Sequence, residues 1–457
     1  MKKTLFLLGL LPMLVGNCSA KSTTPPPPDY GETNTSYVEY FTACLNGSTA
    51  PYTASAPLTA DEVSKTQEIV WNSWRAANGS FTEDKLAELK ALTQTQSGSF
   101  DLTQYEPNAV MPYYYGTKGT AKPDAGWPLF VYMHGSGPKA HEWSTGYTIC
   151  SRFNDAPSAY FIPQIPNEGN YYRWWQVAKQ RAWEKLLRQA FISGEIDPNR
   201  VYFFGISEGG YGSQRLASFY ADYLAAAGPI AGGEPLQNAP AENCANIAFS
   251  LRTGSEDKTF SRNVLTQNTL EEFDRLEGLH PGYYVHNVQV VPGATHTTID
   301  YTPTTPWMKG YTRNPYPKYF FWENFEMDGQ YRNGFYNLYV KQRSNDNTSS
   351  RSCYEMNIEG NTVNLTVTTV TYKVTESDAM GIPLRYAKTY TPATKGEVVI
   401  YLNDQLVDLS QPVTVMVNGR EAFKGMVELN ADNLVNSCAE FYDPMRLYPA
   451  SVDVTIQ

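Results

Sequence analysis

The stretch that decides the fold of this chain is residues 201–219, VYFFGISEGGYGSQRLASF. Its apolar beginning predicts a buried strand, and its end predicts a helix. Between them lies the pattern Gly-x-Ser-x-Gly, centred on Ser207 and flanked by Gly205 and Gly209. A sharp, strained turn needs glycine on both sides of the serine, because a Cβ there would collide with the strand or the helix. The turn presents the Ser207 hydroxyl outside the sheet and puts the next N–H at a helix start, where negative charge is stabilised.

The sequence after Ser207 places an acid and then a histidine, each behind a further predicted strand. The pattern predicts a buried strand, an acidic turn, a helix, a strand and a histidine-containing loop at residues 247–252, 253–257, 264–279, 284–291 and 292–296. The serine and His296 are therefore separated by 89 residues (296 − 207). An order of serine, acid and histidine on successive loops indicates nucleophilic catalysis.

The sequence before Ser207 continues the alternation of strands and helices. Residues 127–133 predict a strand that leads into the turn His-Gly-Ser-Gly at 134–137, and residues 159–162 predict the next strand. Residues 183–191 fall on the intervening helix. Such alternation predicts an α/β protein with a mostly parallel sheet that is covered on both faces.

From about residue 110 to residue 300 the chain resembles a serine α/β-hydrolase. Within that superfamily it is most similar to the esterase branch that includes polyhydroxybutyrate depolymerases, feruloyl esterases and related carbohydrate esterases. The resemblance rests on the compact core, the single His-Gly-Ser-Gly turn and the run DPNRVYFFGIS at residues 197–207. The prolyl-peptidase branch shares the Gly-Gly-Tyr that follows the serine, so the superfamily match is more specific than the branch match. The resemblance implies an acyl-enzyme mechanism without a metal or a cofactor.

The resemblance assigns roles to individual residues. Ser207 would be the nucleophile, and His296 would be the general base and then the general acid. Of the five histidines, only His296 follows the last predicted strand on a loop; the others are residues 134, 141, 280 and 286. Asp257 is the favoured acid, and the adjacent Glu256 is the alternative.

Two further sets of residues are candidates for the site. The backbone N–H groups of Glu208 and Ser136 would form the oxyanion hole. Trp174 and Trp175 lie on a loop after the fourth strand, where this fold carries substrate-facing loops. Clustered aromatic residues stack on sugar or phenolic rings, and they also pack beneath loops. Packing is the favoured interpretation, and substrate binding is the alternative.

The amino terminus predicts an export signal over residues 1–20, with two lysines followed by an apolar run over residues 5–16. It is too short for a stable membrane span. Two cleavage modes stay open: a bacterial lipoprotein with lipidated Cys18, or ordinary cleavage after small residues. The proline-rich tether at residues 21–36 favours the lipoprotein. The protein is therefore expected in the bacterial periplasm or at the cell surface, with membrane contact only through a lipid anchor.

Composition restricts the partners. The net charge is −10 and no basic cluster is present, which argues against nucleic acid. The cysteines after Cys18 show no Cys-x-x-Cys spacing, so no metal site is expected. Export permits disulfides, and Cys353–Cys438 is the pair we expect. The sequence does not determine the oligomeric state.

The remaining segments define the domain organisation. Residues 37–109 predict a mainly helical extension packed on the hydrolase. One helix begins at a capping box over residues 59–62 and a second begins at residues 82–84. Residues 110–305 would form the catalytic domain. Residues 306–457 predict an antiparallel β domain, a sandwich with hairpin turns at 360–361 and 418–419, and we expect it to be structural.

These observations lead to one function hypothesis and two alternatives. The favoured hypothesis is an exported serine carboxylic-ester hydrolase that acts on acetyl or feruloyl esters of carbohydrates. The substrate would be an ester-bearing small molecule or glycan. The first alternative is a serine peptidase of the prolyl-oligopeptidase-like branch. The second is a surface glycan-binding protein on a catalytically silent hydrolase scaffold.

Overall fold

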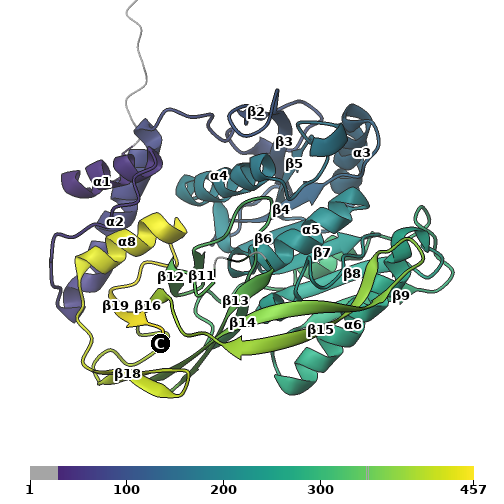
Figure 1. The fold of residues 1–457 in the computed structure, drawn as a ribbon. Helices are drawn as coiled ribbons and strands as arrows, with labels where there is room; N and C mark the ends of the chain where they lie inside the picture. Colours follow the sequence, from purple (N-terminus) through teal and green to yellow (C-terminus); the bar gives the residue numbers. More distant parts are fainter. Residues whose placement is uncertain (1–28, 346, 348) are drawn as a thin grey trace, which may run out of the picture.

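The computed structural model describes residues 29–345, 347 and 349–457 of the chain (Figure 1). The predicted export signal, Cys18 and the first part of the proline-rich tether lie outside the described residues. Among the residues that are described, no helix is long and apolar enough to cross a membrane.

A large sheet forms the centre of the molecule. Within the described residues it contains nine strands: β1 (Lys90–Ala91), β2 (Gly98–Asp101), β3 (Val110–Lys118), β4 (Trp127–Met133), β5 (Ser158–Pro163), β6 (Ile196–Ile206), β7 (Ala226–Ile230), β8 (Ala248–Gly254) and β9 (His286–Val291). Their order is β1-β3-β5-β4-β6-β7-β8-β9, with β2 paired to β3. All neighbours from β5 to β9 are parallel, whereas β3 runs antiparallel to β2 and β5. This order confirms the predicted α/β-hydrolase fold.

Helices cover both faces of the central sheet. They are α3 (Lys139–Arg152), α4 (Val177–Ser193), α5 (Glu208–Phe219), α6 (Arg262–Leu279) and α7 (Thr304–Met308). Alternate residues of β4 face opposite ways, as the period of two requires. Leu129 and Val131 pack in the cluster that contains α4, α5 and α6, whereas Phe130 and Tyr132 pack with α3 and α7. The inner strands β4, β5 and β7 are buried at every position, so they form nearly continuous apolar runs in the sequence.

The amino-terminal segment differs from its prediction. Its helices are α1 (Thr35–Leu45) and α2 (Ala60–Ser80), and α2 begins at the predicted capping box of Thr59 and Glu62. The helix predicted from residue 82 is absent, because tertiary contacts use its capping residues: Glu83 pairs with Arg188 of α4, 2.6 Å apart. Both helices pack against α8 (Ala431–Phe441) of the carboxy-terminal region, and the segment also contacts α4.

The carboxy-terminal region is β-rich. One sheet contains β10 (Tyr319–Asn324), β13 (Ser350–Glu359), β14 (Thr362–Ser377), β15 (Pro383–Pro392), β17 (Val413–Val417) and β18 (Arg420–Gly425). Another contains β11 (Gly334–Phe335), β12 (Leu338–Gln342), β16 (Glu397–Leu402) and β19 (Ala450–Thr455). The hairpins expected at residues 360–361 and 418–419 join β13 to β14 and β17 to β18. The pairing is antiparallel except between β14 and β17.

A buried chain of charges joins the carboxy-terminal region to the hydrolase. Asp222, on the short helix η2 (Ala221–Tyr223) that follows α5, accepts hydrogen bonds from Arg332 and Arg446. Arg446 also donates to Asp443 over 2.9 Å, and Asp443 pairs with Arg313 over 2.7 Å. The side chains of Asp222, Asp443 and Arg446 are fully buried. Removing any partner would leave an uncompensated charge in the interior, so the two regions depend on each other.

The expected disulfide is not formed. Cys353 lies on β13 and Cys438 on α8, and the structure describes both as free, together with Cys44, Cys150 and Cys244. Cys353 packs in the sheet beside Arg351, whereas Cys438 packs in the cluster of α1, α2 and α8. The two cysteines share a region of sequence but occupy different packing units.

Candidate active site

Ser207 forms the turn between β6 and α5 and has a left-handed backbone, with φ 59° and ψ −111°. The chain passes so closely here that side chains are excluded. A Cβ on Gly209 would lie 1.9 Å from the carbonyl oxygen of Met133, and one on Gly205 would lie 2.4 Å from the carbonyl oxygen of Gly209. The two glycines let the nucleophile loop pack directly against β4, and this contact fixes the direction of the serine.

Ser207, His296 and Asp257 lie in a hydrogen-bonded row. The Nε2 atom of His296 is 3.0 Å from Ser207 Oγ, and its Nδ1 atom is 2.6 Å from Asp257 Oδ2. Asp257 is buried, whereas the imidazole is partly exposed. A proton on Nδ1 leaves Nε2 free to accept the serine proton, so the row can activate the hydroxyl. The histidine reaches this position from the loop after β9, as predicted from the chain order.

The structure separates the two candidate acids. Glu256 points to solvent and forms an ion pair with Lys258 over 2.9 Å, and that contact lowers the pKa of the Glu256 carboxyl. Asp257 points inward to His296. Only Asp257 can therefore stabilise an imidazolium in this arrangement.

Arg262, the first residue of α6, binds the other oxygen of Asp257, and no sequence pattern indicated this role. Its Nη1 atom donates to Asp257 Oδ1 over 3.0 Å, and its Nε atom donates to the hydroxyl of Tyr211 over 2.6 Å. The guanidinium carbon lies 5.5 Å from the ring centre of Tyr211 and 5.1 Å from that of Phe260. Both carboxylate oxygens of Asp257 are thus paired, as burial of its charge requires.

The turn at residues 134–137 lies beside the nucleophile: a Cβ on Gly135 would be 3.5 Å from that of Ser207. His134 is buried and accepts a hydrogen bond from the N–H of Ile165 at Nε2, so its Nδ1 donates to the carbonyl of Gly135. Burial lowers the pKa of His134 to about 4, so the ring is neutral and structural.

The candidate oxyanion donors are Glu208, directly after Ser207, and Ser136, in the turn whose Gly135 lies beside Ser207. Glu208 is the first residue of α5, where N–H groups have no partner within the helix. Ser136 follows Gly135 in the adjacent turn. The hydroxyl of Tyr172 lies 2.8 Å from the carbonyl oxygen of Gly135, which helps to fix that turn. An oxyanion formed at Ser207 would therefore meet backbone from two separate elements.

Trp174 and Trp175 have different positions. Trp174 is completely buried, and its indole N–H donates to the carbonyl of His134 over 2.9 Å. A substrate ring cannot stack on it, so the substrate-binding role considered for Trp174 is wrong, and the residue braces the oxyanion turn. Trp175 is partly exposed, but the guanidinium of Arg215 lies 3.8 Å from its ring centre and occupies one face.

The side chain of Glu208 is a further titratable group at the site, and no sequence pattern indicated it. It is largely buried directly after the nucleophile, and Oε2 lies 3.4 Å from Nη1 of Arg173. Desolvation raises the pKa of Glu208 to about 7, and the nearby arginines only partly oppose that effect.

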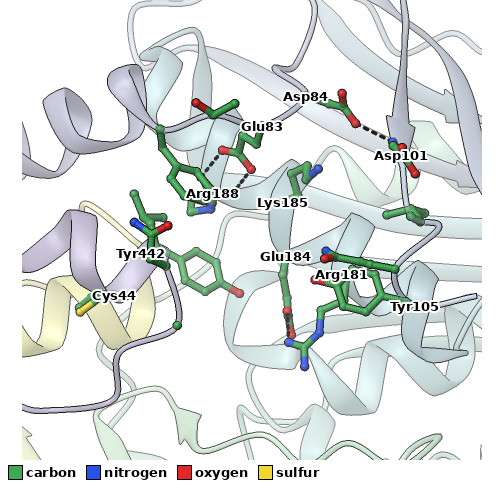
Figure 2. Close-up of a pocket in the computed structure, with 18 of the residues that line it drawn as sticks. Cys44, Glu83, Asp84, Asp101, Tyr105, Arg181, Glu184, Lys185, Arg188 and Tyr442 are labelled. Carbon is green, nitrogen blue, oxygen red and sulfur yellow. Dashed lines mark hydrogen bonds and ion pairs between the residues drawn. The ribbon is translucent and has the colours of Figure 1, made fainter.

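Figure 2 shows a separate pocket of about 1110 Å³, between α4, the ends of α1 and α8, and the segments around residues 81–84 and 101–105. Its lining includes none of the three residues of the hydrogen-bonded row. Four of its charged groups form two ion pairs: Arg188 pairs with Glu83, and Arg181 pairs with Glu184 over 2.8 Å. In the described part of the chain, no group of three or more His, Cys, Asp or Glu side chains is arranged to hold a metal ion.

The strand order and the turn at Ser207 define the α/β-hydrolase fold, and the hydrogen-bonded row is an arrangement that can activate a serine hydroxyl. Comparison with known proteins found no matching family model and no matching curated protein. Similar solved structures include a thermostable esterase, with 20% identity over 47% of this chain and 63% of that chain and a TM-score of 0.34. The match thus spans less than two thirds of that esterase.

Two other solved structures overlap a similar share of the chain. The feruloyl esterase module from Clostridium thermocellum has 17% identity over 48% of this chain and 90% of its own, with a TM-score of 0.30. A putative dipeptidyl aminopeptidase IV from Bacteroides ovatus has 11% identity over 47% of this chain and 34% of its own, with a TM-score of 0.34. Because these similarities are low, the function has to be argued from the site.

Proposed function

We propose that this chain is a serine carboxylic-ester hydrolase that acts through an acyl-enzyme. The observation that carries the proposal is the pair of hydrogen bonds at His296, 3.0 Å to Ser207 Oγ and 2.6 Å to Asp257 Oδ2. Ser207 Oγ attacks the ester carbonyl while His296 takes its proton. The resulting oxyanion faces the backbone N–H groups of Glu208 and Ser136.

The protonated histidine then completes the cycle. Collapse of the tetrahedral intermediate breaks the carbon–oxygen bond of the ester, and His296 gives its proton to the leaving alcohol. Water, deprotonated by the same imidazole, attacks the acyl-enzyme and releases the carboxylic acid and free Ser207. Each half-reaction moves one proton to His296 and back, so the atoms and charges balance using the ester and water alone.

For the substrate we propose acetyl or feruloyl esters of carbohydrates, hydrolysed outside the cytoplasm. Support comes from the predicted export signal and from the composition, with 33 Tyr, 20 Phe and 9 Trp residues. Aromatic side chains are the usual surfaces on which sugar and phenolic rings stack. We propose further that the mature protein is attached through Cys18, which a mass measurement of the exported protein can test.

The first experiment is labelling of the purified protein with an active-site-directed fluorophosphonate, beside Ser207→Ala, followed by intact mass. We expect one adduct per chain in the wild type and none in the variant. Hydrolysis of acetylated and feruloylated glycans, beside matched peptide amides, then tests the bond that is cleaved. Absence of an adduct in the folded wild type would contradict the enzyme proposal and favour a glycan-binding role. Faster cleavage of the amides would favour a peptidase.

A further inference from the structure

The segment directly after the acid of the triad has an unusual backbone. Phe260 and Ser261 are consecutive left-handed residues, with φ 56° and 55°. Bulky residues seldom adopt this conformation, which glycine and asparagine tolerate. The Phe260 side chain is also 48% exposed, so burial does not compensate for the strain. Strain of this kind persists where the surrounding structure imposes it, and it gathers at functional sites.

The guanidinium of Arg262 lies between the exposed ring of Phe260 and Asp257 of the triad, and contacts both. Arg262 contacts Asp257 over 3.0 Å with Nη1, and its guanidinium carbon lies 5.1 Å from the ring centre of Phe260. The same arginine bonds to Tyr211, which lies one helical turn after Ser207. Arg262 thus occupies one side of the ring and ties the ring to the catalytic row.

A distant segment of the chain fixes this conformation. The Ser261 hydroxyl donates to Asp378 Oδ2 over 2.7 Å, across 117 residues. Asp378 lies at the tip of the long β14–β15 hairpin, which runs alongside α6 (Figure 1). Its other oxygen accepts the N–H groups of Met380 and Ile382 over 2.9 and 2.8 Å. The hairpin tip is therefore preformed and presents a fixed acceptor to Ser261.

We propose that Phe260 is a substrate-binding residue that stacks on a ring in the alcohol group of the ester, and that Asp378 is its positioning residue. The inference rests on the proposed esterase function and names its substrate class: esters whose alcohol group carries a sugar or phenolic ring. Aromatic faces bind such rings through offset or edge contacts, and a fixed ring binds with little loss of entropy. The carboxy-terminal β region thereby contributes to specificity through the hairpin.

The test compares phenyl acetate with ethyl acetate, which share the acyl group and differ in the ring. Phe260→Asn removes the ring but keeps a residue that tolerates a left-handed backbone, so folding is preserved. We expect kcat/KM for phenyl acetate to fall about 3- to 10-fold, the range for loss of one ring contact. Ethyl acetate should be unchanged within about twofold, and Phe260→Trp should retain the preference for phenyl acetate. Leu279→Ala, an exposed apolar truncation at the far end of α6, is the control.

The hairpin is tested separately. Ser261→Ala removes the hydroxyl that reaches Asp378, and we expect it to lower phenyl acetate hydrolysis two- to fivefold without changing ethyl acetate. Combined with Phe260→Asn it should add nothing, because both changes remove the same contact. Arg385→Gln removes an exposed ion pair of 2.9 Å between the same hairpin and Glu271 of α6, and should have no effect.

The outcomes separate the two proposals. Equal losses on both acetates, or no loss on phenyl acetate, would overturn the role of Phe260 and leave the esterase intact. Additive losses in the double variant would overturn the role of the hairpin. Wild-type protein that hydrolyses neither acetate and takes no fluorophosphonate would overturn the esterase proposal itself, and this inference with it.

Discussion

The turn at Ser207 and the loop from Asp257 to Arg262 both hold a strained backbone beside the reacting atoms, but different contacts hold each of them. Each carries non-glycine residues in a left-handed conformation beside the reacting atoms. The serine turn is held by backbone packed on backbone, since Gly209 lies against the carbonyl of Met133. The acid loop is held by side chains: Arg262 with Tyr211 on one side, and Ser261 with the distant hairpin on the other.

This difference explains why the serine turn can be recognised from a sequence pattern and the acid loop cannot. Backbone contact at van der Waals distance excludes every residue but glycine, so it leaves a fixed pattern of letters. A hydrogen bond between side chains can be made by several residue types from any distance along the chain, and it leaves no pattern. The following substitutions test whether the two regions respond differently, beginning with the largest expected effect.

Gly209→Ala should break the serine turn. The new Cβ would lie 1.9 Å from the carbonyl oxygen of Met133, so β4 or α5 must move. We expect a loss of more than about 4 kcal/mol in the free energy of unfolding and no fluorophosphonate adduct. Gly278→Ala on α6 is the control, because nothing lies within 4 Å of its new Cβ. It should stabilise the protein by up to about 1 kcal/mol in thermal unfolding. A stable, active Gly209→Ala enzyme would contradict the backbone explanation.

Asp257→Asn should nearly abolish turnover while the protein stays folded. The amide cannot stabilise the imidazolium and favours the wrong tautomer of His296, so kcat should fall by about 10³- to 10⁴-fold. The neighbouring Glu256→Gln should change kcat less than twofold, since that side chain points to solvent. Steady-state kinetics on one ester decides between them. The opposite ranking would assign the role to Glu256.

Arg262→Met should weaken the acid loop without breaking it. It leaves Asp257 Oδ1 without its charged partner, and loss of a charge-assisted hydrogen bond predicts a fall in kcat of about 10- to 100-fold. Arg262→Lys should restore part of the loss. An unchanged kcat with lowered stability would reduce Arg262 to a structural role.

Glu208→Gln should show that the negative charge of Glu208 does not stabilise the folded protein. The folded protein raises the pKa of Glu208 to about 7 from its ordinary value of 4.5, so folding favours the protonated form. The wild type should therefore lose stability as pH rises from about 4.5 to about 7, and the loss should persist above pH 7. The variant should lack this loss and be more stable at pH 8, by up to about 3 kcal/mol. Thermal unfolding at pH 5 and pH 8 measures the difference, and a larger loss in the variant would contradict it.

The same contrast explains what the sequence could predict. The fold and the candidates Ser207 and His296 could be predicted from the glycine spacing and from the order of motifs along the chain. Both can be seen in the sequence without knowing which side chains meet. Asp257 could be favoured over Glu256 but not chosen, because only the tertiary structure shows which side chain points inward. Arg262 was missed because a single arginine at a helix start has no distinguishing pattern. Phe260 was missed because its strain is recognised only from its backbone angle φ, which the sequence does not reveal.

Two errors have a related cause. The capping signal at residues 82–84 was real as a local preference, but Glu83 gains a stronger partner in Arg188, and no helix forms. The expected pair of Cys353 and Cys438 relied on their being in one predicted domain. In the structure that domain contains separate sheets and a helix that packs on the amino-terminal segment, so sharing a domain did not bring the thiols together.

The buried charge chain from Asp222 to Arg446 determines the order in which a newly made chain can become native. The ribosome adds Arg446 224 residues after Asp222, which takes roughly 10–45 s at ordinary translation rates. During that interval the hydrolase sheet can form and Asp222 can pair with Arg332, but its second partner, Arg446, has not yet been made. We therefore expect the nascent hydrolase half to reach its full stability only after Arg446 has joined the buried charge chain. Resistance to proteases should arise only when α8 and the segment behind it have left the ribosome, long after the nucleophile turn has been synthesised.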